Sequence, residues 1–180
     1  AQHYADNFGS PGFDDPERMY IDQNYEGYSE ENQEVWQTLF DGQMEYLATT
    51  ASNVYLSGAK AIGLVRDHIP HLSGPKSINV HLQRLTRWQS RAVPGYLPAK
   101  AFFGCLARRE FPTTIVIRNK AAIDYLPEPD VFHDIFGHVP LHADPVFADF
   151  LQTYGRAALH TTDDEHTLRL ARLFWFTVEF

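Results

Sequence analysis

The stretch "FHDIFGHVPL", residues 132–141, carries two histidines five positions apart, with a glycine between them and a proline shortly after the second. On an α-helix, which turns by about 100° per residue, two side chains five apart point roughly 140° away from each other. Histidine pairs that bind a metal from one helix are usually spaced so that both side chains share a face. His133 and His138 can therefore form one site only if the backbone departs from a regular α-helix.

The residues around the first histidine predict a short helix that stops before the second. Residues 128–130, "EPD", place a proline and two acids at a helix start. Gly137 favours the left-handed conformation that ends a helix, and Pro140 pushes the residue before it toward extended geometry. We therefore expect the helix to stop near Phe136 or Gly137, and His138 to fold back beside the first histidine.

Two imidazoles suit Zn, Cu, Fe or Ni, and a carboxylate would complete a set of three ligands. Glu179 is the candidate, because the segment "LFWFTVEF", residues 173–180, is otherwise almost wholly apolar and an unpaired acid is costly to bury there. Two histidines and one carboxylate are the ligand pattern of non-haem Fe(II) oxygenases. The spacing alone leaves open a core histidine beside a helix-capping histidine, an exposed Glu179, or a zinc hydrolase site with Asp134 as general base.

The composition predicts a single globular domain and argues against nucleic-acid and membrane partners. The chain has 180 residues, of which 44% are hydrophobic, so it is long and apolar enough to form a core. The net charge is -8 and no dense run of Lys or Arg occurs, which argues against a nucleic-acid partner. No apolar run is long enough to span a membrane, and residues 1–17 lack the pattern of a signal peptide.

Cysteine usage favours a reducing compartment. Cys105 is the only cysteine, so neither an intrachain disulfide nor a thiolate zinc cluster can form. Disulfides are rare in the cytoplasm. We therefore expect a cytoplasmic protein.

The pattern of apolar residues and helix-start signals predicts a mainly α domain with a small antiparallel β ribbon. Residues 1–28 have no sustained period and are expected to form an extended N-terminal arm before a domain at 29–180. Strands are expected at 87–94 and 112–119, the second being short and β-branched. Helices are expected at 29–47, 52–66, 77–85, 98–106, 128–136, 145–157 and 163–180.

Two long motifs carry a family resemblance. "YLPEPDVFHDIFGHVPL" (residues 125–141) and "LARLFWFTVEF" (residues 170–180) resemble the catalytic domain of the pterin-dependent aromatic amino acid hydroxylases, in particular its bacterial branch. The resemblance runs from about residue 28 to the C-terminus and is strongest from residue 88 onward. It implies that His133, His138 and Glu179 hold a mononuclear Fe(II) and form the catalytic centre. It also implies that the fold is C-terminally truncated, since the family's stretch beyond Glu179 is missing.

The resemblance further assigns residues to substrate and cofactor. Arg118 would bind the carboxylate of the amino-acid substrate, whose planar oxygens match a guanidinium fork. The remaining assignments are Tyr125, Pro129 and Trp175 around the aromatic ring of the substrate, and Gly95, Tyr96, Leu97, Phe102 and Asp134 around the pterin. Without the family, Arg118 would be read as a surface residue at a strand end, and the aromatic residues as core packing.

The reaction that the resemblance implies is hydroxylation of L-phenylalanine to L-tyrosine. It would use O2, Fe(II) and a tetrahydropterin, either tetrahydrobiopterin or a similar compound, in a chain that we expect to be a monomer. Two alternatives stay open. One is tryptophan or tyrosine hydroxylation within the same family, and the other is a truncated form that binds metal or amino acid without turnover.

Overall fold

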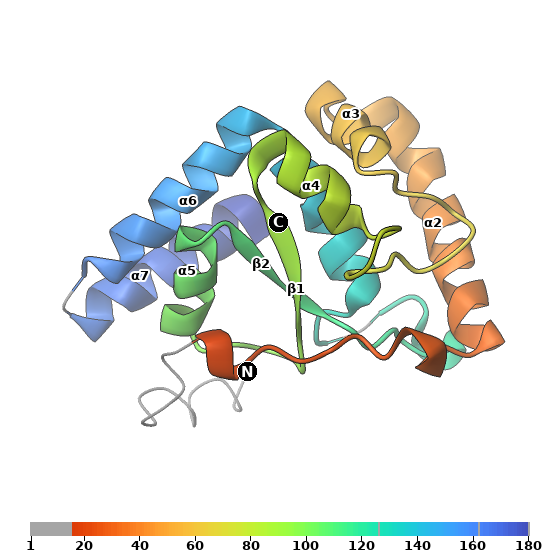
Figure 1. The fold of residues 1–180 in the computed structure, drawn as a ribbon, viewed down its shortest axis with the longest axis horizontal. Helices are drawn as coiled ribbons and strands as arrows, with labels where there is room; N and C mark the ends of the chain where they lie inside the picture. Colours follow the sequence, from red (N-terminus) through yellow and green to blue (C-terminus); the bar gives the residue numbers. More distant parts are fainter. Residues whose placement is uncertain (1–15, 126, 162, 180) are drawn as a thin grey trace.

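The computed structural model describes residues 16–125, 127–161 and 163–179, and most of these residues are helical, as the sequence predicts. Figure 1 shows α2 and α3 at one end of the molecule, α5, α6 and α7 at the other, and the two strands between them. The α-helices are α2 (Glu30–Thr50), α3 (Asn53–Ala61), α4 (Ile78–Thr86), α5 (Ala99–Ala107), α6 (Pro145–Leu159) and α7 (Asp164–Phe174). The strands are β1 (Gln89–Val93) and β2 (Glu110–Thr114); π-helical segments are η4 (His133–His138) and η6 (Trp175–Glu179); and 3-10 turns are η1 (Pro16–Arg18), η2 (Tyr25–Gly27), η3 (Lys120–Ala122) and η5 (Val139–Ala143).

The N-terminal arm is described only in its second half. Residues 1–15 of the expected arm lie outside the described residues. Between η1 and η2, the N–H of Ile21 donates to the carbonyl of Ala92 in β1 at 3.0 Å. The hydroxyl of Tyr28 donates to the carbonyl of Ile115, just beyond β2, at 2.6 Å. This part of the chain therefore lies across the strands.

The two strands run parallel, so the predicted antiparallel ribbon is wrong. Gln89 pairs with Glu110 and Val93 with Thr114. The connection between the strands contains α5, and such a helical crossover returns the chain to the starting end of the sheet. The second strand is also shorter than predicted, because β1 ends before Pro94 and residues beyond Thr114 have no partner strand among the described residues.

Side-chain caps and one glycine set the helix ends. Ser29 and Asn32 form a reciprocal capping box at the start of α2, and the carboxylate of Asp144 accepts the N–H of Phe147 at the start of α6. The helix predicted over 52–66 ends earlier, at Ala61, because Gly63 turns the chain with a φ of +72°.

The core joins α2 to the segment that carries the two histidines. Trp36 of α2 is fully buried and meets the ring of Phe132 edge-on, with centroids 5.2 Å apart. Phe40, one helical turn later, meets the ring of Phe136 at 5.3 Å. These two ring pairs pack the segment that carries the histidines against α2. None of the helices in the described ranges is long and apolar enough to cross a membrane.

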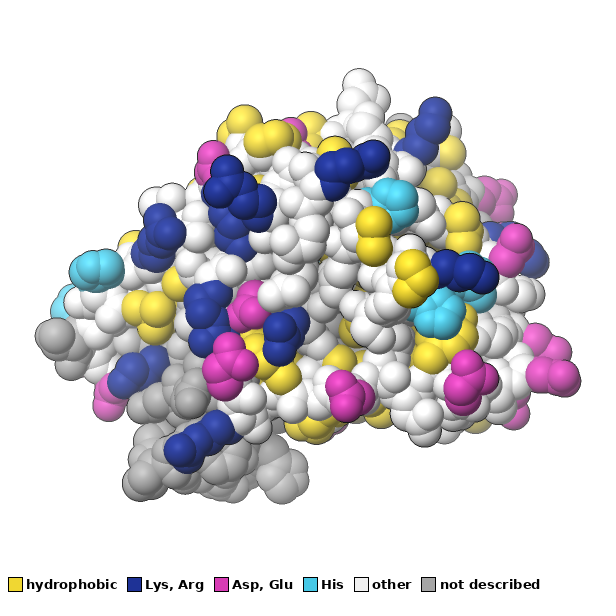
Figure 2. All heavy atoms as spheres, in the orientation of Figure 1, with side chains coloured by type: hydrophobic (Ala, Val, Ile, Leu, Met, Phe, Trp, Pro, Cys, Tyr) yellow, Lys and Arg dark blue, Asp and Glu magenta, His cyan; other side chains and the backbone are white. Residues whose placement is uncertain are grey.

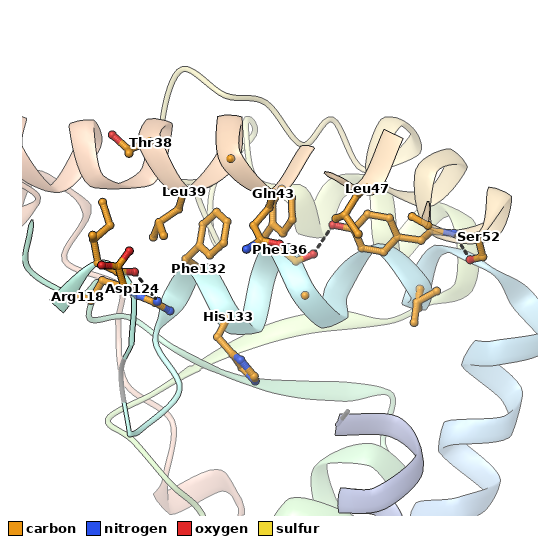
Figure 3. A pocket seen from close by; sticks show the side chains of 16 residues that line it. Thr38, Leu39, Gln43, Leu47, Ser52, Arg118, Asp124, Phe132, His133 and Phe136 are labelled. Carbon is orange, nitrogen blue, oxygen red and sulfur yellow. Dashed lines mark hydrogen bonds between the residues drawn. The ribbon is translucent and has the colours of Figure 1, made fainter. Parts of the chain in front are cut away.

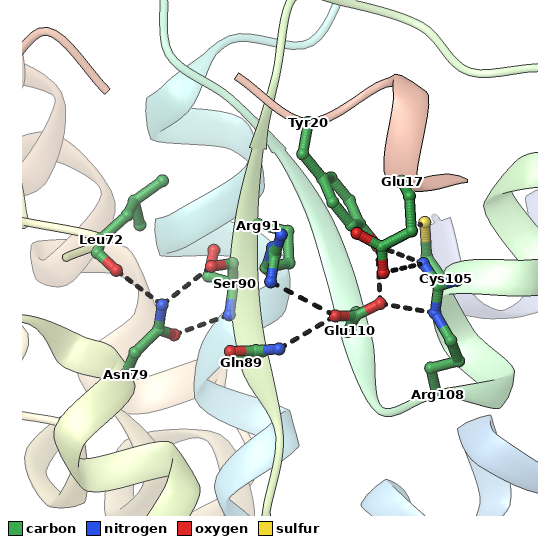
Figure 4. A network of polar contacts seen from close by, with 10 residues as sticks. All are labelled: Glu17, Tyr20, Leu72, Asn79, Gln89, Ser90, Arg91, Cys105, Arg108 and Glu110. Carbon is green, nitrogen blue, oxygen red and sulfur yellow. Dashed lines mark hydrogen bonds and ion pairs between the residues drawn. The ribbon is translucent and has the colours of Figure 1, made fainter. Parts of the chain in front are cut away.

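A buried carboxylate joins the N-terminal segment to the strands (Figure 4). The hydroxyl of Tyr20 and the Nε of Arg108 donate to Oε2 of Glu110 at 2.6 and 2.8 Å. The amide of Gln89 donates to Oε1 at 2.9 Å, and Nη1 of Arg91 lies 3.5 Å from the same oxygen. Figure 2 shows acidic and basic side chains alternating on the surface in this region. Because four side chains neutralise or bond one buried acid, the network stabilises the crossover and the segment before η2 together.

We predict that Gly155→Ala destabilises the fold through the contact of α5 with α6. A Cβ on Gly155 would lie 2.6 Å from the backbone nitrogen of Ala107 and 2.7 Å from the carbonyl of Phe103, so the two helices must separate. We expect the free energy of unfolding in urea to fall by roughly 1–3 kcal/mol. The control is Gly42→Ala in α2, where no described residue lies within 4 Å of the new Cβ. That variant should gain about 0.5–1 kcal/mol. Equal effects in both variants would contradict the packing argument.

We also predict a large loss of stability for Glu110→Ala. The change leaves the hydroxyl of Tyr20 and the amide of Gln89 without their buried acceptor, and the expected loss is roughly 3 kcal/mol in chemical denaturation. The matched control is Glu17→Ala. Its carboxylate lies 3.7 Å from Nη2 of the same Arg108 but is largely exposed, so its removal should cost much less. Unfolding of the two variants at the same denaturant concentration would contradict a stabilising role for the buried carboxylate.

Candidate metal centre

The two histidines lie on a π-helical turn, and this winding brings them together. The N–H of Val139 donates to the carbonyl of Asp134, five residues earlier, which is the hydrogen bond that defines a π-helix. Side chains five apart then lie one above the other. The prediction that the helix stops near Phe136 or Gly137 is therefore wrong. Gly137 does not adopt the left-handed conformation, and the helical winding continues through His138 into η5.

Three side chains converge at one end of this turn. The Nε2 atoms of His133 and His138 lie 3.1 Å apart. Oε1 of Glu179, at the end of η6, lies 3.0 Å from Nε2 of His133, and Oε2 lies 3.5 Å from Nε2 of His138. One ligand atom from each residue lies within 4.8 Å of the others. Two neutral imidazoles and a carboxylate in this arrangement fit a divalent transition metal.

Glu179 and His133 each favour the charged form of the other. Burial alone would raise the pKa of Glu179, but its hydrogen bonds to His133 and His138 outweigh this and lower the pKa to about 2. Burial alone would lower the pKa of His133, but the bond to Glu179 and the nearby charges of Asp134 and Asp130 raise it above its ordinary value. The carboxylate is therefore anionic at neutral pH, and its charge favours positive charge at His133.

Asp134, predicted to contact the pterin, is fixed to the end of β2. Its Oδ2 accepts the backbone N–H of Thr114 at 2.7 Å and the Thr114 hydroxyl at 2.8 Å. Burial raises the pKa of Asp134 to about 6, against the lowering effect of these bonds. The sequence analysis did not identify Thr114 as part of the site. Its sequence signal is weak, since it is one of several β-branched residues in the strand.

Arg118, predicted to bind the substrate carboxylate, is held by Asp130. Its Nε and Nη2 donate to the two carboxylate oxygens at 2.8 and 3.0 Å, and Nη1 donates to the carbonyl of Ile123 at 3.2 Å. Of the five N–H groups of a guanidinium, these contacts leave one on each terminal nitrogen to face a ligand. The same Asp130 accepts the backbone N–H of His133 at 2.9 Å. From its sequence position Asp130 is only a helix-start acid, whereas in the structure it links Arg118 to His133.

Two hollows adjoin the site. A cleft of about 380 Å³ brings together Gly95, Arg118 and Pro129, which the sequence assigned to the pterin turn and the substrate. A groove of about 770 Å³ runs between α2 and η4 and is lined by Leu39 and Phe136 among others (Figure 3). In this view the ring of His133 points away from α2. Arg118 lines both hollows, and His133 lines the groove, so the cleft and the groove each adjoin part of the predicted site.

The other predicted residues are less enclosed. Tyr125 is 75% exposed and Trp175 is 46% exposed, so neither forms a closed pocket wall in the described part of the chain. Phe102 is half-buried and meets Phe174 edge-on at 5.1 Å. Leu97 is buried in a small cluster on α5. Burial and the charge of Glu179 raise the pKa of Tyr96, which places its hydroxyl in the electrostatic field of the three-residue site.

The sequence matches a family model along most of its length. The model of biopterin-dependent aromatic amino acid hydroxylases matches residues 23–180. The phenylalanine-4-hydroxylase of Caulobacter vibrioides is 44% identical over 160 residues, which are 89% of this chain and 53% of the relative. The phenylalanine-4-hydroxylase of Pseudomonas aeruginosa is 41% identical over 163 residues, which are 91% of this chain and 61% of the relative. The chain thus spans little more than half the length of these relatives.

The fold is also similar to that of solved structures. Phenylalanine hydroxylase from Chromobacterium violaceum, with bound iron(III) and 7,8-dihydrobiopterin, gives a TM-score of 0.85 at 36% identity over 98% of this chain and 62% of that one. A structure of the enzyme from the same organism with iron and phenylalanine gives 0.81 at 38% identity, over 89% of this chain and 56% of that one. Since the similarity extends from the sequence to the backbone, the chain belongs to the family of biopterin-dependent aromatic amino acid hydroxylases.

Proposed function

We propose that this chain carries the iron site of a phenylalanine 4-monooxygenase, which hydroxylates L-phenylalanine to L-tyrosine with O2 and a tetrahydropterin. The convergence of His133, His138 and Glu179 on one point carries the proposal. Two imidazoles and one carboxylate form the ligand set of non-haem Fe(II) oxygenases. The similar structures from Chromobacterium violaceum hold iron, dihydrobiopterin or phenylalanine, which supports the same set of ligands here.

Bound Fe(II) and the reduced pterin would supply the activation of O2, which protein side chains do not provide. The residues of the chain would bind and orient. Arg118, already held by Asp130, would take the substrate carboxylate with its two remaining N–H groups. Asp130 also bonds the backbone of His133, so the distance from the substrate anchor to the metal is set by one buried carboxylate. Such fixed placement of reactants is a major source of rate enhancement.

The aromatic and pterin contacts belong to the same proposal. Pro129, Tyr125 and Trp175 would surround the ring of the substrate. Gly95, Tyr96 and Leu97 would offer backbone groups to the pterin, Phe102 would stack on it, and Asp134 would contact it through water. The cleft that joins Gly95, Arg118 and Pro129 supports a substrate and a cofactor side by side. We also infer a monomer and a cytoplasmic location, the latter because Cys105 is the only cysteine and is a buried free thiol.

A second candidate is a form that binds metal and amino acid without turnover. The exposure of Tyr125 and Trp175 favours it, because hydroxylation needs a pocket that excludes water. Tryptophan or tyrosine hydroxylation is the near alternative within the family. Phenylalanine, tyrosine and tryptophan differ in the size and polarity of their ring. Tyr125 and Trp175, which would contact this ring, are exposed.

We predict that the chain binds one Fe(II), or one Co(II) as a probe, and that His138→Ala abolishes binding. The reason is that two remaining ligands do not hold the ion in a fixed geometry. The measurement is isothermal titration of the metal-free chain, followed by an assay with Fe(II), tetrahydrobiopterin, O2 and each aromatic amino acid in turn. The control is His160→Ala. This change removes an exposed histidine at the C-terminal end of α6, and the variant should bind the metal as the unaltered chain does.

The assay separates the candidates. Tyrosine formed from phenylalanine, with matching pterin oxidation, supports the monooxygenase. Metal binding without any hydroxylated product supports the second candidate. A chain that binds neither Fe(II) nor Co(II) at the three residues would contradict both.

We predict that metal affinity rises with pH through the titration of His133. Metal ligands must lose their protons before binding. Because the pKa of His133 is raised, the proton competes with the metal at pH values above the ordinary 6.5 of histidine, and the competition ends as the pH passes that raised pKa. Glu179 adds no pH dependence near neutrality, since its pKa of about 2 keeps it anionic. Titrations with Co(II) from pH 6 to pH 8.5 measure the effect, and a flat profile would contradict it.

A further inference from the structure

The carbonyl of Phe136 lies inside the turn between the two histidines and takes its hydrogen bond from another helix. In an α-helix its donor would be the N–H of residue 140, but residue 140 is a proline and has none. The hydroxyl of Tyr55, on α3, donates to this carbonyl at 2.7 Å instead. A buried carbonyl without a donor is costly, so the contact satisfies a group that the sequence of the turn leaves open.

We propose that Tyr55 is a positioning residue for the metal ligands. Its hydroxyl fixes the Phe136 carbonyl in the π-helical turn, and this turn is what places His133 and His138 on one face. The winding is an uncommon one that proteins keep mostly at functional sites, so it needs stabilising contacts from outside the turn. The proposal rests on the metal site proposed above and adds to it a residue that contacts neither metal nor substrate.

The position of Tyr55 is set by three features of α3. The side chain of Ser52 caps the helix and accepts the N–H of Tyr55 at 3.2 Å. A Cβ on Gly58 would overlap the carbonyl oxygen of Pro140, so only glycine lets α3 approach η5 this closely. Tyr55 is 7% exposed, and its ring packs against that of Phe136 with centroids 6.1 Å apart. Packing of the ring therefore fixes the position of the hydroxyl next to the Phe136 carbonyl.

A second side chain bonds the same turn. Nδ1 of His142 donates to the carbonyl of His138 at 3.0 Å, which requires a proton on Nδ1. The ring of His142 is buried edge-on against Trp88, with centroids 4.6 Å apart. The carbonyls of residues 136 and 138 are thus held by side chains of two different elements. Replacing His142 would also remove a core ring, so Tyr55 gives the sharper test.

The test is Tyr55→Phe, which removes one oxygen atom and keeps the ring. We expect Co(II) affinity of the metal-free chain to fall about tenfold, which is the lower end of the range for residues that orient metal ligands. We also expect the visible absorption bands of bound Co(II) to shift, because they report the coordination geometry. The matched control is Tyr25→Phe, whose hydroxyl makes the same kind of bond, to the carbonyl of Ile69 at 2.9 Å, in a part of the chain outside the site.

The outcomes separate the two proposals. If the unaltered chain binds no Co(II), the proposed metal site itself fails. If it binds Co(II) and Tyr55→Phe matches Tyr25→Phe in affinity and spectrum, the positioning role is overturned. Should Tyr55→Phe fail to unfold cooperatively, Pro140→Ala takes its place. That change gives residue 140 an N–H that competes for the Phe136 carbonyl, and it should also weaken binding and shift the bands. Unchanged binding in Pro140→Ala would overturn the proposal.

Discussion

The hydrogen bond from the N–H of Val139 to the carbonyl of Asp134 is the interaction on which the arrangement of the site depends. A bond that spans five residues widens the turn, and the two histidines then share a face. The intervening side chains face other directions, with Asp134 bonded to β2 and Phe136 packed against α2. The change from α-helical to π-helical winding therefore brings the two histidines together and lets the same turn contact both β2 and α2.

Two carboxylates, the buried Asp130 and the partly exposed Glu179, connect the remaining parts of the site to this turn. Asp130 bonds the guanidinium of Arg118 on one side and the backbone of His133 on the other. Glu179 arrives from the second π-helical segment, η6, and bonds both imidazoles. Residues from three separate stretches of the chain, namely Arg118, the segment 130–138 and Glu179, thus meet within a few hydrogen bonds of one another. A shift of this segment would move His133, His138 and Arg118 together.

Local sequence signals identified which residues meet but not how the backbone brings them together. An apolar C-terminal segment with a single acid predicted Glu179 as the third group, and its carboxylate does lie beside the two histidines. The winding at Gly137 was mispredicted, since a glycine permits a left-handed residue without requiring it. The donor that replaces the missing N–H of Pro140 comes from Tyr55, which is 81 positions away from its acceptor. The direction of β2 likewise depends on the path of α5, which the strand's own residues do not encode.

Two buried acids four residues apart on the same segment show how neighbours decide charge. The pKa of Asp130 is lowered despite its burial, because the guanidinium of Arg118 and two backbone N–H groups outweigh the loss of solvent. For Asp134, burial prevails over the hydrogen bonds from Thr114 and over the nearby charges of His133 and His138, and its pKa rises to about 6. A dication held by His133 and His138 would add further positive charge beside Asp134 and would favour its anionic form. The charge of Asp134 would therefore respond to occupation of the proposed metal centre, whereas the bonds of Asp130 to Arg118 already favour its anionic form.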